Sequence, residues 1–134
     1  MRNKWPINPT DIPDNKILVL GQSPGFAGSP EVSKTIQRVK GWMLQCGIQE
    51  QEYDWRNCVD VPGAKVKMKD VALNRFEVAN YEKVICLGIS ASKWCERLKI
   101  KHIKVPHPSG LNRQWNDPSV EPNVINNINS YLVR

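Results

Sequence analysis

The 134-residue sequence has no long hydrophobic run, and this absence excludes an integral membrane protein built on helices. No apolar stretch approaches the ~20 residues that span a bilayer. Residues 1–6 lack the apolar core of a signal peptide, so we expect an intracellular, cytoplasmic protein that does not associate with membranes. Repeats and low-complexity segments are also missing, which favours one domain over residues 1–134.

Closely spaced cysteines are missing as well. The four cysteines stand at positions 46, 58, 86 and 95, without a Cys-x-x-Cys pair. Zinc and iron–sulfur sites usually contain such pairs, so the spacing predicts no metal ion and no other cofactor. Without a secretory signal disulfides are not expected either. We therefore predict reduced structural thiols, with Cys86 as a small core residue inside an apolar run.

Acidic residues are too few to balance the basic ones. The chain has 19 Lys and Arg against 13 Asp and Glu, a net charge of +6. Such an excess is typical of proteins that neutralise phosphates, and it favours DNA as a partner. Many basic proteins bind no nucleic acid, so the charge alone does not decide. The stretch 65–70 is either a DNA-facing surface or a solvated segment.

What the sequence does contain is an alternation of short apolar runs and helical patterns. This alternation predicts an α/β domain with a central, mainly parallel sheet of four strands and helices on both faces. The expected strands are 17–20, 53–61, 84–87 and 103–105, and the expected helices are 29–47, 90–98 and 117–133.

Apolar residues at helical spacing predict which helix faces enter the core. The first helix would bury its Val, Ile and Leu side chains, with Trp and Met on the same helix also in the core. The terminal helix would bury one row of its own. These residues are Val32, Ile36, Val39, Leu44, Trp42 and Met43 in the first helix, and Val120, Val124, Ile128 and Leu132 in the last.

Two rigid polar loops follow predicted strands near opposite ends of the chain. Gly21-Gln22-Ser23-Pro24-Gly25 follows the first strand, and His107-Pro108-Ser109-Gly110-Leu111-Asn112-Arg113 follows the last. Ligands of open α/β sheets bind beyond the carboxyl ends of the strands. We therefore expect both loops to line one site, with backbone N–H groups on one side and an imidazole on the other.

These two loops, with Arg56-Asn57-Cys58-Val59 between them, resemble the uracil-DNA glycosylase superfamily. The Ser-Gly-Leu form of the last loop is most similar to the mismatch-specific uracil and thymine glycosylase branch. The resemblance covers residues 17–132. It implies a monomeric, monofunctional glycosylase that flips a uracil or related pyrimidine out of DNA and hydrolyses its N-glycosidic bond during base excision repair.

The resemblance also assigns roles to the base-binding residues. His107 would donate a hydrogen bond to the negative charge that develops at uracil O2; the alternative is a loop histidine bonded to a backbone carbonyl. Asn57 would read the base edge, or else satisfy its own backbone in a turn. Phe26 would stack on the base, although the family's aromatic usually lies further along the chain. Gly21 and Gly25 would let the backbone approach the base.

Other residues of the last loop are matched to DNA contacts. Leu111 stands where the family has a wedge that fills the gap left by the flipped base. Arg113 would contact a phosphate or the opposite base, and Ser109 and Gly110 complete the DNA-binding loop. Trp115 either anchors this loop to the domain or stacks on a base.

The first turn departs from the family pattern at the residues that activate water. The family has a carboxylate or an Asn there, whereas this chain has Gln22 and Ser23. Both can orient water, but neither is an effective proton acceptor. Asp54 and Asp60 flank Asn57 and are alternative bases, although we expect both on the surface. The alternatives are therefore a catalytically weak or inactive DNA- or base-binding protein, or an enzyme for a modified base in an unusual genome.

Overall fold

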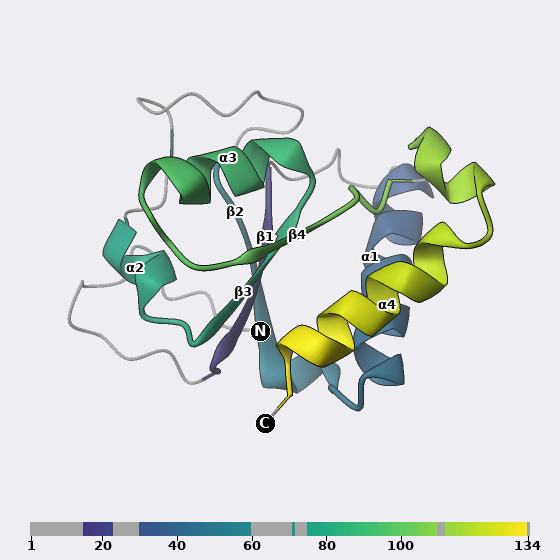
Figure 1. Cartoon of the computed structure of the whole chain (residues 1–134), viewed down its shortest axis with the longest axis horizontal. Coiled ribbons are helices and arrows are strands. Elements are labelled where there is room, and N and C mark those ends of the chain that lie inside the picture. The colour runs from purple at the N-terminus through teal and green to yellow at the C-terminus, as the bar shows by residue number, and fades with distance from the viewer. Residues whose placement is uncertain (1–14, 23–29, 60–70, 72–74, 110–111, 134) are drawn as a thin grey trace.

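The computed structural model describes residues 15–22, 30–59, 71, 75–109 and 112–133 (Figure 1). None of the helices in these segments combines the length and the apolarity needed to cross a membrane. In chain order the elements are β1 (Ile17–Gly21), α1 (Pro30–Gln45), η1 (Glu50–Glu52), β2 (Tyr53–Asn57), α2 (Arg75–Ala79), β3 (Lys83–Leu87), α3 (Ile89–Arg97), β4 (Ile103–Val105), η3 (Arg113–Asn116) and α4 (Val120–Tyr131).

The four strands form one parallel sheet in the order β2-β1-β3-β4. β1 lies in the interior of the sheet, and all five of its residues are buried. A continuous apolar run suits such a strand, because both of its faces are covered. The predicted α/β class with a four-stranded parallel sheet is confirmed.

Alternate residues of the strands enter two separate hydrophobic clusters. Ile17 and Val19 of β1 pack with residues of α1 and α4, whereas Leu18 and Leu20 pack with residues of α2 and α3. Successive side chains of a strand point to opposite faces, so the two clusters lie on the two sides of the sheet. Figure 1 shows α1 and α4 side by side, apart from α2 and α3.

Leu44 was wrongly predicted to enter the core, since its side chain is 55% exposed. Five residues separate it from the buried Val39, which places it about 140° away around the helix. Trp42 and Met43 fill the core instead, as predicted. In the terminal helix the predicted row is confirmed for Val124, Ile128 and Leu132, which are all buried, and Val120 is half-buried.

Strand β2 ends at Asn57, earlier than the predicted Val61. Its hydrogen bonding to the first turn nevertheless continues, because the N–H groups of Cys58 and Val59 donate to the carbonyls of Gly21 and Gln22 (3.0 and 3.1 Å). Residues 60 and 61 lie outside the described residues.

Buried polar side chains lie on the face of β2 that is in register with Leu18 and Leu20. Asp54 accepts hydrogen bonds from the Tyr81 hydroxyl (2.5 Å) and the Asn15 amide (3.0 Å), and is 7% exposed. The prediction of a surface carboxylate at this position was therefore wrong. Asp54 and Tyr53 are neighbours in β2, so their side chains lie on opposite faces of the sheet. Both side chains are buried, because the sheet is covered on both faces at this point.

A buried ion pair connects β2 with α2. The guanidinium of Arg56 lies 3.4 Å from the carboxylate of Glu77, and the two side chains are 9% and 1% exposed. Two charges removed from water need such a partner, because the cost of an uncompensated buried charge is several kcal/mol. The pair holds the short α2 against the edge strand.

We expect Glu77→Ala to lower the free energy of unfolding by about 3–5 kcal/mol, because Arg56 then stays buried without this carboxylate. Urea unfolding measures the change. Glu82→Ala is the matched control: its partner Lys16 lies 4.0 Å away and both side chains are largely exposed, so the loss should stay below about 1 kcal/mol. Equal losses in the two variants would contradict the assignment.

Candidate active site

Gly21 and Asn57 are the last residues of β1 and β2, and His107 follows β4, so all three lie at the carboxyl ends of the strands. From the central β1 the chain first adds β2 on one side and then crosses to β3 on the other. The connections that leave β1 and β3 therefore diverge, and this switch point is where open α/β sheets bind ligands. Gly21 is the last residue of β1, and Gly88 directly follows β3.

Asn57 lies against the backbone of Gly21. The two residues are in register at the ends of β2 and β1. A Cβ atom at Gly21 would stand 2.5 Å from Oδ1 of Asn57, closer than two such atoms can approach. An added side chain at this position would therefore displace the Asn57 amide, for which the glycine makes room. The structure thus brings together two of the predicted base-binding residues.

His107 occupies a similar place over Gly88, on the turn between β3 and α3. A Cβ atom at Gly88 would lie 3.3 Å from Cβ and 3.4 Å from Cδ2 of His107. Gly88 also has a φ of 89°, a conformation that favours glycine. Its N–H donates to the carbonyl of Val105 (2.8 Å), which joins the turn to the end of β4. The loop that carries His107 therefore starts from a defined position.

The hydrogen bonding of His107 defines which ring nitrogen carries the proton. Its Nδ1 accepts the backbone N–H of Ser109 (3.1 Å), so the neutral ring has its hydrogen on Nε2. The side chain is exposed, yet the protein atoms around it desolvate the ring and lower its pKa. The ring is thus a neutral hydrogen-bond donor at neutral pH.

Two side chains hold the backbone of His107: Asn112 near the end of the loop and Trp115 beyond it. Its carbonyl accepts hydrogen bonds from the Asn112 amide (2.9 Å) and the Trp115 indole (3.0 Å). Asn112 also caps η3 by accepting the N–H of Gln114 (3.1 Å). Trp115 therefore anchors the loop to the domain, one of its two predicted roles. Sequence reasoning missed Asn112, whose signal is an Asn directly before a helical turn.

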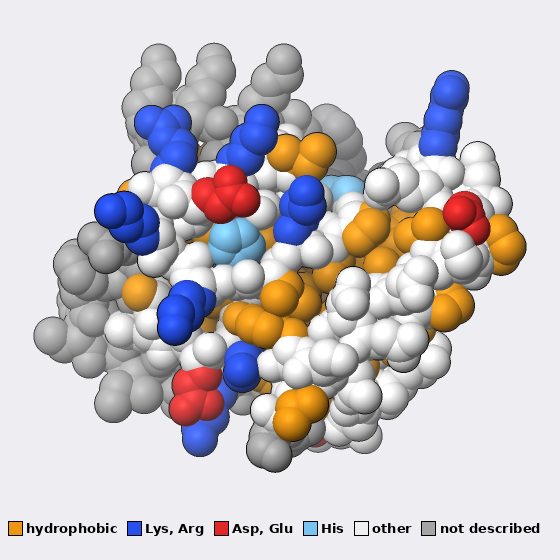
Figure 2. Space-filling model, in the orientation of Figure 1, with side chains coloured by type: hydrophobic (Ala, Val, Ile, Leu, Met, Phe, Trp, Pro, Cys, Tyr) orange, Lys and Arg blue, Asp and Glu red, His pale blue; other side chains and the backbone are white. Residues whose placement is uncertain are grey.

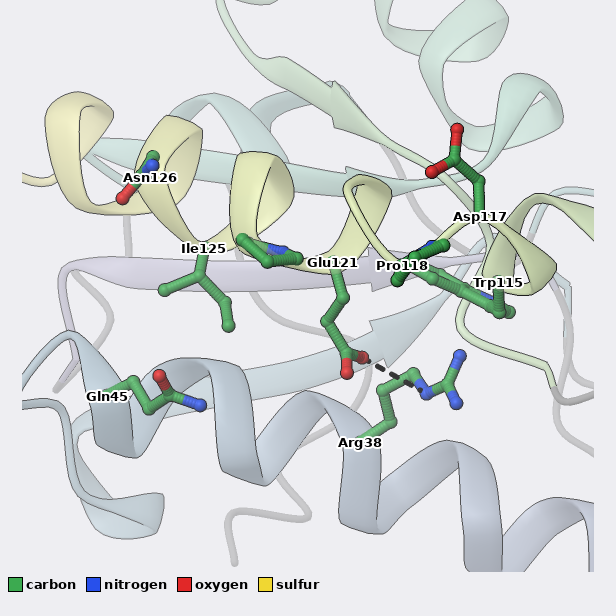
Figure 3. A pocket seen from close by; sticks show the side chains of 9 residues that line it. Arg38, Gln45, Trp115, Asp117, Pro118, Glu121, Ile125 and Asn126 are labelled. Atoms are coloured by element: carbon green, nitrogen blue, oxygen red, sulfur yellow. Dashed lines mark ion pairs between the residues drawn. The ribbon is translucent and has the colours of Figure 1, made fainter.

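Trp115 is itself held between α1 and α4. Its ring centroid lies 5.5 Å from that of Trp42 and 4.5 Å from the Arg38 guanidinium carbon. Glu121 accepts a hydrogen bond from Trp42 (3.0 Å) and pairs with Arg38 (3.3 Å), as the dashed line in Figure 3 shows. We refer to Arg38, Trp42, Trp115 and Glu121 as the Trp115 anchor.

A groove of about 440 Å³ lies between α1 and α4 at this anchor (Figure 3). Arg38, Trp115 and Glu121 line it, whereas Asn57 and His107 do not. Nε of Arg38 pairs with Glu121 and the Arg38 guanidinium lies over the Trp115 ring, so we assign the groove to the support of the loop and not to the candidate site.

The other predicted site residues are described in part. Gln22 is half-buried, with its carbonyl bonded to Val59, and Ser109 is half-buried beside His107. Arg113 is exposed at the start of η3. The remaining predicted residues lie outside the described residues, and so do the alternative base and the basic stretch: Ser23, Gly25, Phe26, Gly110, Leu111, Asp60 and 65–70.

Basic side chains lie on the surface formed by α3 and by the segment that leads into β4. Figure 2 shows Lys and Arg side chains spread over the side of this face that α3 and β4 occupy. The exposed ones in this region are Lys93, Arg97, Lys99, Lys101 and Lys104. Such a surface attracts polyanions.

No protein-family model matches the chain, and no curated protein matches it either.

We expect Gly21→Ala to destabilise the protein by about 1–3 kcal/mol, because the added methyl group displaces the Asn57 amide. Gly41→Ala is the matched control. Gly41 lies in α1 with open space around it, so alanine should stabilise the helix by about 0.4–1 kcal/mol. Urea unfolding of both variants measures the effects. A neutral Gly21→Ala variant would show that Asn57 does not lie against this glycine.

The two histidines should have opposite neutral tautomers. His107 should have its hydrogen on Nε2, whereas His102 should have it on Nδ1, which contacts the Ile100 carbonyl (2.8 Å). ¹⁵N NMR chemical shifts distinguish the two forms.

A pH titration followed by the same ¹⁵N shifts should give His107 a pKa below the usual 6.5. Since the unfolded chain then binds the proton more tightly, the contribution of His107 to stability should decrease as the pH falls through this range. A midpoint at or above the usual value would contradict the desolvated donor.

Proposed function

We propose that this chain is a monofunctional DNA glycosylase that hydrolyses the N-glycosidic bond of uracil, or of a related modified or mismatched pyrimidine, in DNA. One observation carries the proposal: Asn57 and His107 lie over Gly21 and Gly88, on either side of the switch point of a parallel sheet. An amide and a neutral imidazole N–H are the two groups that recognition and departure of a pyrimidine need.

Asn57 supports recognition of the base. A carboxamide offers an acceptor and two donors, which match the N3–H and O4 of uracil and mismatch the corresponding edge of cytosine. The tight contact with Gly21 restricts where the amide can lie. A restricted amide loses little conformational freedom when the base binds, which favours both affinity and discrimination.

His107 supports departure of the base. When the glycosidic bond breaks, the bonding electrons leave with the pyrimidine, and negative charge develops on its O2. A neutral imidazole held by the Ser109 N–H presents Nε2–H without a change of protonation state. A donor aimed at developing charge contributes typically ~10²–10³-fold to the rate.

The attacking water has no carboxylate to deprotonate it in the first turn. Gln22 follows β1, and its backbone is held by Val59, so its amide and the adjacent Ser23 are suited to orient a water molecule. Orientation without deprotonation predicts slow turnover. The missing carboxylate also favours the second candidate, a catalytically weak or inactive glycosylase-fold protein that binds DNA or a base.

The basic surface supports a DNA substrate. Lys101 and Lys104 are exposed on the segment that leads to His107, and Arg113 is exposed beyond it. Phosphate contacts from such residues supply affinity without reading the sequence. We expect the chain to bind DNA as a monomer, with an affinity that falls steeply as the salt concentration rises.

We expect the chain to release uracil from single- or double-stranded oligonucleotides, detected as strand breaks after alkaline treatment. His107→Ala should reduce the single-turnover rate ~10²–10³-fold while DNA affinity stays within about twofold, because the donor acts on charge that develops in the transition state. Gln51→Ala is the control, since Gln51 is exposed next to the amino end of β2, at the opposite edge of the sheet.

The outcomes separate the two candidates. Ser23→Asp should leave the rate unchanged or raise it, because it adds a water-orienting carboxylate to the turn. If the wild type binds these oligonucleotides but neither it nor Ser23→Asp releases any base, the second candidate, an inactive protein that binds DNA or a base, is correct. If His107→Ala and the wild type release uracil at equal rates, the role of His107 is wrong.

A further inference from the structure

Two cysteines and a histidine meet inside the second hydrophobic cluster, away from Asn57 and His107. Cys86 is in β3, Cys95 is in α3, and His102 precedes β4. One ligand atom from each of the three lies within 4.8 Å of the other two. We refer to Cys86, Cys95 and His102 as the thiol–imidazole cluster. Both cysteines are completely buried, whereas His102 is half-buried and provides a route from solvent.

The spacing of the sulfur atoms agrees with tetrahedral zinc coordination. Sγ of Cys86 lies 3.6 Å from Sγ of Cys95. With zinc–sulfur bonds of about 2.3 Å, two thiolates of a tetrahedral site stand about 3.8 Å apart, and a sulfur and an imidazole nitrogen about 3.6 Å apart. The three groups therefore need to move by no more than about 1 Å to surround one ion.

His102 already has the hydrogen-bonding pattern of a metal ligand. Its Nδ1 donates to the Ile100 carbonyl (2.8 Å), so the lone pair of the neutral ring is on Nε2. That lone pair accepts the Ser92 hydroxyl hydrogen (2.8 Å), so the hydroxyl has to rotate away when Nε2 binds a metal ion. Metal-binding histidines usually donate their second N–H to a carbonyl in this way, because it fixes the tautomer and orients the ring.

Cys58 offers a fourth thiol. It is buried in the same hydrophobic cluster as Cys86 and Cys95. Burial and then the nearby Cys95 raise its pKa to about 12. The pKa of Cys86 is raised too, first by its hydrogen bond with Cys95 and then by burial. These two thiols are therefore protonated at neutral pH, and a soft cation must displace their protons in order to bind.

We propose that the thiol–imidazole cluster binds one Zn²⁺ ion, with Cys86, Cys95 and His102 as ligands and Cys58 or a water molecule in the fourth position. On binding, the S–H bonds of the ligating cysteines break, zinc–sulfur bonds form, and the protons pass to solvent. No electron is transferred. The ion joins β3, α3 and the start of β4, which are the elements that carry Gly88 and lead to His107. By joining these elements, the ion would stabilise the turn at Gly88 between β3 and α3.

Zinc titration of the reduced, chelator-treated full chain tests the proposal, in competition with a chromophoric chelator. We expect one ion per chain, release of two or three protons per ion at neutral pH, and a higher melting temperature. Cobalt should bind in the same place and produce the absorption of tetrahedral thiolate coordination. Cys95→Ser and the half-buried His102→Gln should each weaken zinc binding by more than about tenfold.

Cys46→Ser is the matched control, because Cys46 follows α1 and its thiol contacts the Ile125 carbonyl, not the cluster. This variant should bind zinc like the wild type. Less than one ion per chain, or an equal loss of affinity in Cys46→Ser and His102→Gln, would overturn the proposal. Formation of a Cys86–Cys95 disulfide in air without any zinc uptake by the reduced chain would overturn it as well.

Discussion

Two positions without a side chain, Gly21 and Gly88, determine where polar groups can lie at the carboxyl edge of the sheet. Asn57 occupies the space that a Cβ at Gly21 would take, and His107 packs over Gly88. Side chains at the ends of neighbouring parallel strands would otherwise fill this edge. The two glycines therefore bring an amide and an imidazole to the backbone of the switch point, and the proposed base recognition depends on both contacts.

The position of His107 also depends on the packing of α1 and α4. Its carbonyl is bonded to Trp115, whose ring packs on Trp42 and under Arg38. Glu121 joins Arg38 to Trp42 across α1 and α4. A loop held in this way by a packed aromatic ring is more rigid than one held by backbone turns alone. Rigid positioning matters because a donor that is displaced by 1 Å loses much of its effect on the transition state.

The two sides of the sheet differ in the number of polar side chains that they bury. On the side of α1 and α4 the core is apolar and the polar contacts lie at its rim. On the side of α2 and α3 an ion pair and a carboxylate are buried, namely Arg56–Glu77 and Asp54. The ion pair joins α2 to β2. The proposed zinc site lies on the same side and would have the same effect on α3.

The local pattern of the sequence indicated the four strands, the helices α1, α3 and α4 and the two loops, because apolar periodicity and the Gly and Pro positions act over a few residues. It did not predict the short α2. It also singled out Asn57 and His107 as site candidates. It placed Leu44 on the wrong side of its helix and missed the local cap formed by Asn112. It also missed the burial of Asp54, which depends on long-range packing against Tyr81. The meeting of Cys86, Cys95 and His102, and the place of Asn57 over Gly21, come only from the tertiary structure. Strand register and helix packing bring these residues together, and neither is encoded in spacing along the chain.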